Sequence, residues 1–211
     1  MKFPQIFPLL QRRGRHCAFT LIELLTVISI IAIMAAFLVP AATAALRAAR
    51  NNKTLVKLHD VIDMSNLYHT QYHIWPTMQA NLPPGQEDYP LQLKNDNGTF
   101  VRVMTGKVVT PDEVKLNTLQ IPFGSFSTSD LDPETNTKFV DAYGNQDIII
   151  FFDTDGNGNI SAKNISSASV TSLDGKNLSA PQTVDVKSPV IIMTPGAGVS
   201  NNDVITSWDV R

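Results

Sequence analysis

The hydrophobic residues of this chain form one long block near the N-terminus and several short runs after residue 145. Leu24–Leu46 is a stretch of 23 residues without a charged side chain. As an α-helix it would be about 35 Å long at ~1.5 Å per residue, which is enough to cross a hydrocarbon core of roughly 30 Å. The stretch therefore predicts a helix that enters a membrane at some stage.

Beyond the apolar block, the pattern is that of an amphipathic helix. Apolar residues recur at spacings close to three and four from Leu55 to Tyr68, and neither Gly nor Pro occurs from Ala41 to Trp75. Pro76 ends this pattern. We expect one helix over about residues 20–74, whose second half packs one apolar face on a sheet.

The C-terminal region contains short β-branched or aromatic runs that are bounded by Asp, Asn, Gly or Pro. These runs are Gln146–Phe152, Ser188–Thr194 and Val204–Val210. A helix followed by strands predicts the α+β class, with a long N-terminal transmembrane helix packed on a small C-terminal antiparallel β-sheet.

The middle of the chain has a weaker pattern. Residues 76–98 are rich in Pro, Asn and Gly, so they predict a loop. Thr99–Val109 alternates enough to predict an edge strand or a strand pair, and short strand candidates occur around Leu119–Phe126.

The near-neutral net charge of −2 hides an uneven distribution. Residues 1–18 and residues 47–59 each carry four Lys or Arg and no acid, whereas residues 60–211 carry nine basic and eighteen acidic residues. The acidic C-terminal region argues against binding to nucleic acid. The equal positive charge on both sides of the apolar block does not select a membrane orientation, although the second basic stretch leaves contact with acidic lipid headgroups open.

No group of residues in the sequence has the spacing of an enzyme active site. Cys17 is the single cysteine, so the chain has no internal disulfide, and Arg15 and His16 before it exclude a lipid-anchoring cysteine. His69 and His73 have the i,i+4 spacing of zinc ligands, but no third ligand accompanies them. An exposed helix face is the better interpretation of the two histidines, and we predict that the protein is not an enzyme.

Glu23 directly precedes the apolar block and is the one charged residue from Phe19 to Leu46. A carboxylate at the centre of a membrane helix costs on the order of 2.5–3.5 kcal/mol, and less near the interface. Glu23 therefore needs either a positive partner or a path for its carboxylate to the lipid headgroups.

The residues around Glu23 resemble a known motif. Ala18-Phe19-Thr20-Leu21-Ile22-Glu23-Leu24-Leu25 is similar to the N-terminal processing and methylation motif of type IV pilins and type II secretion pseudopilins. The resemblance implies that prepilin peptidase cleaves between Ala18 and Phe19 and methylates the new amine of Phe19. The family usually has Gly where this chain has Ala18. The alternative is an ordinary signal peptide, cleaved within the alanine-rich end of the apolar block.

The same resemblance gives roles to two residues of the apolar helix. Cleavage before Phe19 creates a positive α-amine, which a carboxylate four residues along the helix can neutralise in its own chain or in a neighbour. In the family this contact joins subunits, so Glu23 is the predicted assembly residue. Pro40 removes one backbone hydrogen bond and predicts a helix kink, as in pilins that have a proline at this place.

The resemblance extends more loosely over the C-terminal region. Pseudopilins have a D-x-x-G-N motif and a closing segment that ends in Trp, which match Asp141–Asn145 and Asp203–Trp208. The predicted organisation is a leader at 1–18, a hydrophobic transmembrane and assembly helix at 19–46, its amphipathic continuation at 47–75 and a pilin-like α+β head at 76–211.

Two places are candidates for calcium. Asp153, Asp155 and Asn157 match the opening of an EF-hand loop, in which oxygen ligands alternate and the sixth residue is Gly. The twelfth residue is Asn164 instead of Glu, and both flanks predict strands. A hairpin turn without metal explains the same residues.

The second calcium candidate comes from the resemblance. Major pseudopilins bind calcium in a C-terminal loop that corresponds to Pro195–Asp203, where Asp203 would be one ligand. Asn201 and Asn202 supply only neutral oxygens, so a loop without metal is the alternative. No cofactor other than calcium is expected.

Together these features predict a structural subunit of a type IV pilus-like or type II secretion filament, closest to a major pseudopilin. The chain would be a single-pass protein of the bacterial inner membrane with its C-terminal part outside the cytoplasm, and later part of a periplasmic or cell-surface filament. Expected partners are further copies of itself, prepilin peptidase, an inner-membrane assembly platform and minor pilins. The alternative is a minor pilin that acts as a tip adhesin or as a binding module for a surface, DNA or a secreted substrate.

Overall fold

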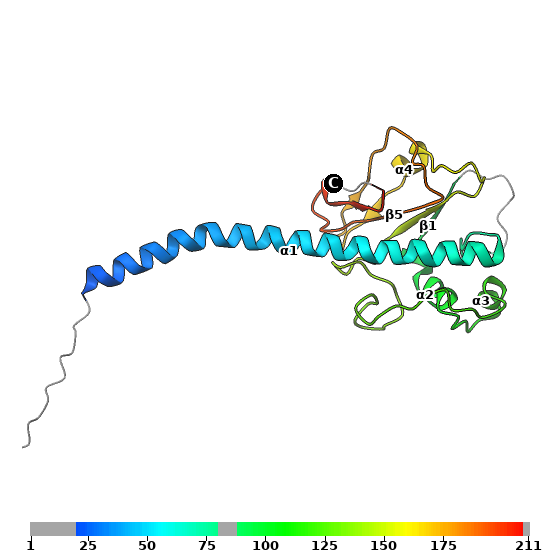
Figure 1. Ribbon diagram of the computed structural model, residues 1–211, viewed down its shortest axis with the longest axis horizontal. Coiled ribbons are helices and arrows are strands. Elements are labelled where there is room, and N and C mark those ends of the chain that lie inside the picture. Colours follow the sequence, from blue (N-terminus) through cyan, green and yellow to red (C-terminus); the bar gives the residue numbers. More distant parts are fainter. Residues whose placement is uncertain (1–19, 80–87, 209–211) are drawn as a thin grey trace, which may run out of the picture. The chain divides into compact units, whose positions relative to one another are not determined.

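The computed structural model describes residues 20–79 and 88–208 (Figure 1). The chain divides into two units, Met1–Ala44 and Ala45–Arg211. We call the second unit the body and describe each unit by itself. Ala18 and Phe19, the predicted cleavage site, lie outside the described residues.

Helix α1 spans Leu21–Tyr72 and confirms the long helix predicted from the hydrophobic pattern. It ends before Pro76 because His73 adopts a left-handed backbone with φ of 57°. The His73 N–H donates to the His69 carbonyl at 2.8 Å, which closes the last turn in the manner of a helix C-cap. The helix continues through Pro40, and the kink at that residue stays a prediction.

The body contains an antiparallel sheet of four strands in the order β1-β2-β5-β6. The strands are β1 (Tyr89–Gln92), β2 (Ile149–Phe152), β5 (Val190–Thr194) and β6 (Ile205–Thr206). The three predicted C-terminal runs contain β2, β5 and β6. The body part of the long helix α1 packs on this sheet, which confirms the α+β prediction.

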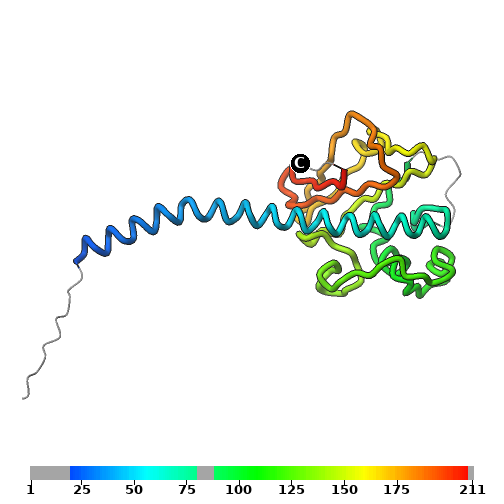
Figure 2. The backbone as a smooth tube through the Cα atoms, in the orientation of Figure 1, coloured from blue at the N-terminus to red at the C-terminus, as the bar shows by residue number. Residues whose placement is uncertain are grey.

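Shorter elements complete the body. They are α2 (Leu93–Met104), α3 (Pro111–Leu116), α4 (Ala162–Ser167), the 3₁₀ helix η1 (Asn201–Asp203), and strands β3 (Val170–Thr171) and β4 (Asn177–Leu178), which pair with each other. Figure 2 shows the C-terminal segment, in orange to red, beside the part of α1 that belongs to the body.

Every residue of the central strands β2 and β5 is buried, so both faces of these two strands are covered. Alternate residues point to opposite faces. Ile150, Phe152 and Ile192 pack with α1 and α2 in one core, whereas Phe151 and Ile191 pack with α4, β3 and β4 in the other. Burial on two faces explains why these strands are continuous apolar runs instead of alternating ones.

The strand prediction for Thr99–Val109 is wrong, because most of this segment belongs to helix α2. The buried residues Leu93, Asn97, Phe100, Val101 and Met104 have helical spacing, but the first of them precede the predicted strand. The Asn97 side chain also pairs with the Phe139 backbone, donating to its carbonyl at 2.8 Å and accepting from its N–H at 2.5 Å. This long-range contact satisfies the hydrogen-bonding groups of Asn97, a polar residue that the sequence pattern placed in a loop.

Two further predictions in the middle of the chain are wrong. The predicted loop 76–98 contains β1 and the start of α2; Pro90 is tolerated because β1 is an edge strand. Leu119–Phe126 forms no strand, since the Asn117 side chain accepts from the Ile121 N–H and donates to its carbonyl. The N–H and the carbonyl of Ile121, which would have paired in a strand, are therefore satisfied by a side chain.

Candidate functional site

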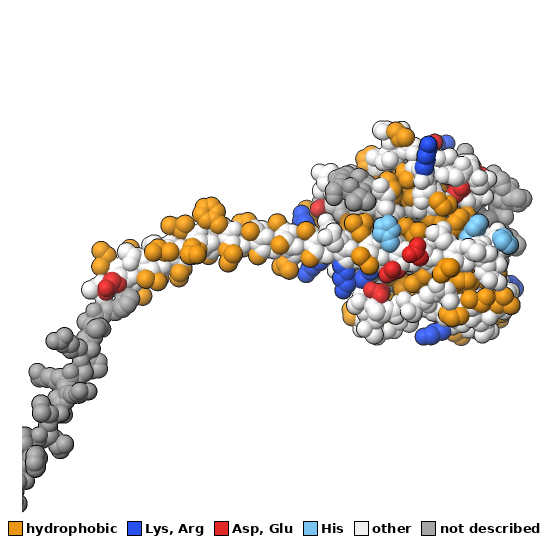
Figure 3. Space-filling view, in the orientation of Figure 1, with side chains coloured by type: hydrophobic (Ala, Val, Ile, Leu, Met, Phe, Trp, Pro, Cys, Tyr) orange, Lys and Arg blue, Asp and Glu red, His pale blue; other side chains and the backbone are white. Residues whose placement is uncertain are grey.

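The first unit exposes an apolar surface. Every residue from Thr20 to Arg50 is exposed in the single chain, including Leu21 at 82% and Phe37 at 77%. Figure 3 shows hydrophobic side chains over the visible face of this part of α1. By length and composition α1 can cross a membrane. A surface of this kind is stable only against lipid or against other apolar helices.

Glu23 closes a capping box at the start of α1. Its Oε2 accepts hydrogen bonds from the Thr20 N–H at 2.8 Å and from Thr20 Oγ1 at 2.7 Å, while its own N–H donates to Thr20 Oγ1 at 3.3 Å. The spacing Thr20-x-x-Glu23 is the sequence signal for this motif, and the sequence analysis above missed it. The carboxylate is thereby directed to the N-terminal end of the helix, close in sequence to Phe19.

The basic stretch after the apolar block has a role inside the body. Arg47 pairs with Asp203 at 3.5 Å. Lys57 is buried, donates to the carbonyls of Ser129 at 2.6 Å and Val140 at 3.0 Å, and lies 3.4 Å from an Asp130 carboxylate oxygen. Burial lowers the pKa of Lys57, and the charge of Asp130 opposes that effect. At least two of the four basic side chains therefore hold α1 to the rest of the body.

The motif Asp141–Asn145 joins three segments of the body. The Asp141 carboxylate accepts from the Asn145 N–H at 2.9 Å, the Asn145 side chain at 2.7 Å and Thr194 Oγ1 at 2.7 Å. Ala142, the second residue of the motif, donates its N–H to Thr54 Oγ1 of α1 at 3.1 Å. The motif is a structural clamp between α1 and the end of β5.

The Asp153 loop follows β2 directly. Asp153 is 6% exposed, and its carboxylate accepts the N–H groups of Gly156, Asn157 and Gly158 at 2.7–3.1 Å. Gly158, the sixth residue of the EF-hand pattern, has φ of 79°, which suits the sharp turn of such a loop.

The hairpin interpretation of the Asp153 loop is wrong. Strand β2 pairs with β1 and β5, and the loop leads through a bridge between Ile160 and Val186 into helix α4. The prediction of strands on both flanks is correct only for the N-terminal flank. Ser161 caps α4 by accepting the Asn164 N–H, which is why a helix begins where the sequence indicated a strand.

Asp88 completes an acidic cluster that the sequence analysis missed. Asp88, Asp153 and Asp155 each offer a carboxylate oxygen, and these oxygens all lie within 4.8 Å of one another. Asp88 Oδ2 accepts from the Ser161 N–H at 2.6 Å and from the Asn164 side chain at 3.3 Å. Burial raises the pKa of Asp88, and the charges of Asp155 and Asp153 add to this effect. No sequence spacing signals this residue, because Asp88 lies before β1.

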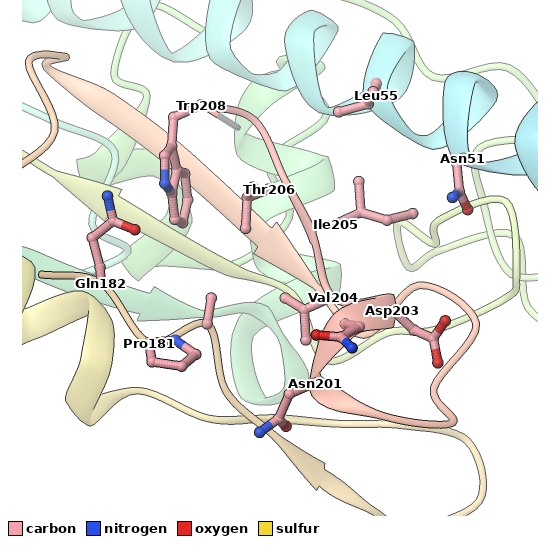
Figure 4. A pocket seen from close by; sticks show the side chains of 12 residues that line it. Asn51, Leu55, Pro181, Gln182, Asn201, Asp203, Val204, Ile205, Thr206 and Trp208 are labelled. Atoms are coloured by element: carbon pink, nitrogen blue, oxygen red, sulfur yellow. The ribbon is translucent and has the colours of Figure 1, made fainter. Parts of the chain in front are cut away.

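Asp203 lies in a different place from the acidic cluster. Its Oδ2 accepts the N–H groups of Val199 at 3.1 Å and Ser200 at 2.9 Å, and Arg47 pairs with Oδ1. It lines a pocket of about 280 Å³ together with Asn51 and Leu55 of α1 and the C-terminal segment (Figure 4). Calcium binding by Asp203 stays a prediction. The carboxylate of Asp203 already has Arg47 as a positive partner.

His69 and His73, the pair with the spacing of zinc ligands, lie on either side of the end of α1: His69 is in the helix and His73 directly follows it. The His69 ring stacks on Trp75 with centroids 4.0 Å apart, whereas His73 has the left-handed backbone that ends the helix. Burial lowers the pKa of His69, with His73 adding to the effect and Asp153 opposing it. Over residues 20–79 and 88–208, only the acidic cluster at Asp88 brings three or more His, Cys, Asp or Glu side chains close enough together to hold a metal ion.

Comparison with known proteins places the N-terminal segment. Residues 13–39 match the protein-family model of the prokaryotic N-terminal methylation motif. This prepilin-type motif confirms the resemblance and indicates a protein like type IV pilins or pseudopilins. Proteins with the motif are processed by prepilin peptidase and assemble into filaments, and pilin-like proteins are generally structural. Searches of curated proteins and of solved structures gave no match.

Proposed function

We propose that this protein is a structural subunit of a type IV pilus-like or type II secretion filament, closest to a major pseudopilin. The observation that carries the proposal is the methylation motif at residues 13–39, which leads directly into a helix with an exposed apolar surface. The same surface serves two stages. It anchors the subunit in the inner membrane first, and it packs against the helices of other subunits in the filament afterwards.

Processing generates the charge that assembly needs. Prepilin peptidase cleaves between Ala18 and Phe19 and methylates the amine of Phe19, which then stands at the end of an apolar helix. An uncompensated positive charge in an apolar filament core is costly, so the amine requires an anionic partner.

Glu23 is the partner that we assign to this amine. In the described chain, its Oε2 accepts hydrogen bonds from Thr20, whereas Oε1 accepts none. We infer that Oε1 binds the methylated amine of a neighbouring subunit, while the capping box fixes the direction of the carboxylate. One contact for each pair of subunits sets the register of the helices in the filament.

The test of this proposal uses Glu23→Ala in cells that carry the assembly machinery. We expect the variant to insert in the membrane and to be processed at Phe19, but to yield few or no sheared filaments. Asp63→Ala, an exposed acid on the body part of α1, is the matched control and should assemble normally. Filaments of Glu23→Ala at the wild-type level would contradict the assembly mechanism.

Two further measurements test the class of protein. Mass spectrometry should show a mature chain that begins at methylated Phe19; a chain that begins near residue 46 would make it an ordinary secreted protein. The amount of the protein in sheared filaments tests the major-subunit role. A major subunit is the abundant component, whereas a tip adhesin or other minor pilin is present in few copies.

A further inference from the structure

The acidic cluster of Asp88, Asp153 and Asp155 joins two segments that are far apart in sequence. Asp88 precedes β1, while Asp153 and Asp155 follow β2, the strand paired with β1. Oxygens of the three carboxylates lie within 4.8 Å of one another. Among the described residues, none of the ion pairs includes any of these three side chains. Carboxylates this close repel one another when they are charged, so the cluster calls for a positive partner.

One oxygen of the cluster is buried without a hydrogen bond. Asp88 is 6% exposed, and within the described chain its Oδ1 is the one buried side-chain N or O atom without a partner. Leaving a buried polar atom unsatisfied costs about 1–3 kcal/mol, and more when the group is charged. The unpaired Asp88 Oδ1 therefore indicates a ligand, such as a cation, that accepts an electron pair from this oxygen.

Asp88 supplies what the Asp153 loop lacks as a calcium loop. In an EF-hand, the twelfth residue is a Glu whose carboxylate reaches back to the ion. Here the twelfth residue is Asn164, and its side chain donates to Asp88 Oδ2 at 3.3 Å. The Asp88 carboxylate thus lies within reach of the twelfth position, but it comes from another segment of the chain.

We propose that Asp88, Asp153 and Asp155, with the side-chain oxygen of Asn157, bind one calcium ion. Four oxygen donors, of which three are anionic, suit a hard cation. The solvent-exposed loop 155–158 lets water complete the six to eight ligands that calcium takes, whereas magnesium demands near-ideal octahedral geometry. Asp153 Oδ1 accepts two N–H groups and Oδ2 accepts one, so a lone pair of Oδ2 is left for the ion.

The ion would connect several elements of the body. Ser161 N–H binds Asp88 at the start of α4, and the Trp75 indole donates to the Asp153 carbonyl at 2.6 Å just after the end of α1. Calcium therefore stabilises the end of the body where α1, β1, β2 and α4 meet. This role is separate from Glu23 and from filament assembly, so each proposal can fail without the other.

Trp75 makes the site measurable in the full chain in detergent micelles. Terbium replaces calcium in oxygen sites, and a nearby excited tryptophan transfers energy to it. We expect saturable terbium luminescence on tryptophan excitation, competed away by calcium but not by magnesium at the same concentration. We also expect calcium to raise the Tm of the body, because it binds only the folded state. A folded wild-type protein without saturable luminescence would overturn the proposal.

Variants locate the ion. Asp88→Asn and Asp155→Asn should each raise the Kd for terbium at least about tenfold and abolish the calcium-dependent rise in Tm. Asp155 is exposed, so its variant keeps the test valid if Asp88→Asn fails to fold. The matched control Asp174→Asn, in the exposed turn between β3 and β4, should bind as the wild type does.

Asp203→Asn distinguishes the two calcium candidates. It should leave the terbium Kd unchanged, since Asp203 lies outside the acidic cluster. Unchanged affinity in Asp155→Asn, or loss of binding in Asp203→Asn alone, would overturn the proposal and assign the ion elsewhere.

Discussion

The two parts of α1 differ in what stabilises them. From Leu21 to Ala44 all side chains are exposed in the single chain, and Glu23 is the one charged residue. From Ala45 to Tyr72 the same helix has buried residues that pack and form hydrogen bonds within the body. They are Thr54, Lys57, Leu58, Val61, Met64, Ser65 and Tyr68. The first part depends on a lipid or protein environment outside the chain, whereas the second part is stabilised by the chain itself.

This difference predicts that mutations of buried residues in the second part destabilise the body without affecting membrane insertion, whereas mutations in the first part leave the stability of the body unchanged. The largest effect is expected for Asp141→Ala. It removes several hydrogen bonds to a carboxylate that is 2% exposed, and should lower the free energy of unfolding of the body by about 3–5 kcal/mol. Urea unfolding of the full chain in micelles measures it.

Asp63→Ala is the control for Asp141→Ala, since Asp63 is exposed on α1. Its effect should stay within about 0.5 kcal/mol. An equal loss of stability in both variants would contradict the role of Asp141–Asn145 as a clamp.

Lys57→Met should follow in size. The change removes the cation that binds two carbonyls and Asp130, and a loss of about 2–3 kcal/mol is expected, because these acceptors become unsatisfied. Lys53→Met, one turn earlier and exposed, is the matched control and should change the unfolding free energy little. A similar effect of both substitutions would show that Lys57 acts through overall charge.

The body should also lose stability in acid through Glu113. Its carboxylate binds Arg102 and closes the capping box of α3, and the hydrogen bonds from Arg102 lower its pKa to about 2, against burial. A lowered folded pKa stabilises the body above the ordinary value of 4.5, and this contribution is lost as the pH falls from about 4.5 to about 2.

Glu113→Gln isolates this contribution. Urea unfolding at a series of pH values should show that the variant is less stable than the wild type near neutral pH, and that the difference shrinks towards pH ~2. A difference that is constant over this range would contradict the assignment.

The smallest effect is expected in the first part of α1. Thr20→Val removes the capping box with Glu23 and should weaken the first helical turn by about 1 kcal/mol, without changing the stability of the body. Hydrogen exchange should be faster at the amides just after residue 20. Thr26→Val, whose hydroxyl donates only within the helix, is the control. A changed stability of the body in Thr20→Val would contradict the conclusion that the two parts of α1 are stabilised independently.

The sequence predicts those parts of the fold that rest on long or strongly patterned runs. The uninterrupted apolar and amphipathic pattern gives α1, and the apolar runs at Gln146–Phe152 and Ser188–Thr194 contain β2 and β5 because burial on both faces requires them. Helix α2 is missed because Asn97 is satisfied by Phe139, a contact that exists only in the folded chain. The segment after Asn117 is missed for the same kind of reason.

The candidate sites divide in the same way. Glu23 and the Asp153 loop are predicted because each is a local motif. Asp88 is missed because its relation to Asp153 depends on the pairing of β1 with β2. The capping box of Thr20 with Glu23 is different, since its signal is local and was available in the sequence.

The packing of α1 through the body has a mechanical consequence. From Thr54 to Trp75 the helix and the residues after it are bound at successive points: Thr54 to the clamp, Lys57 to two carbonyls, and Trp75 to Asp153. A pull along this part of α1 would load these contacts together, in shear, instead of opening them one at a time. A body attached in this way should resist tension until many contacts break at once.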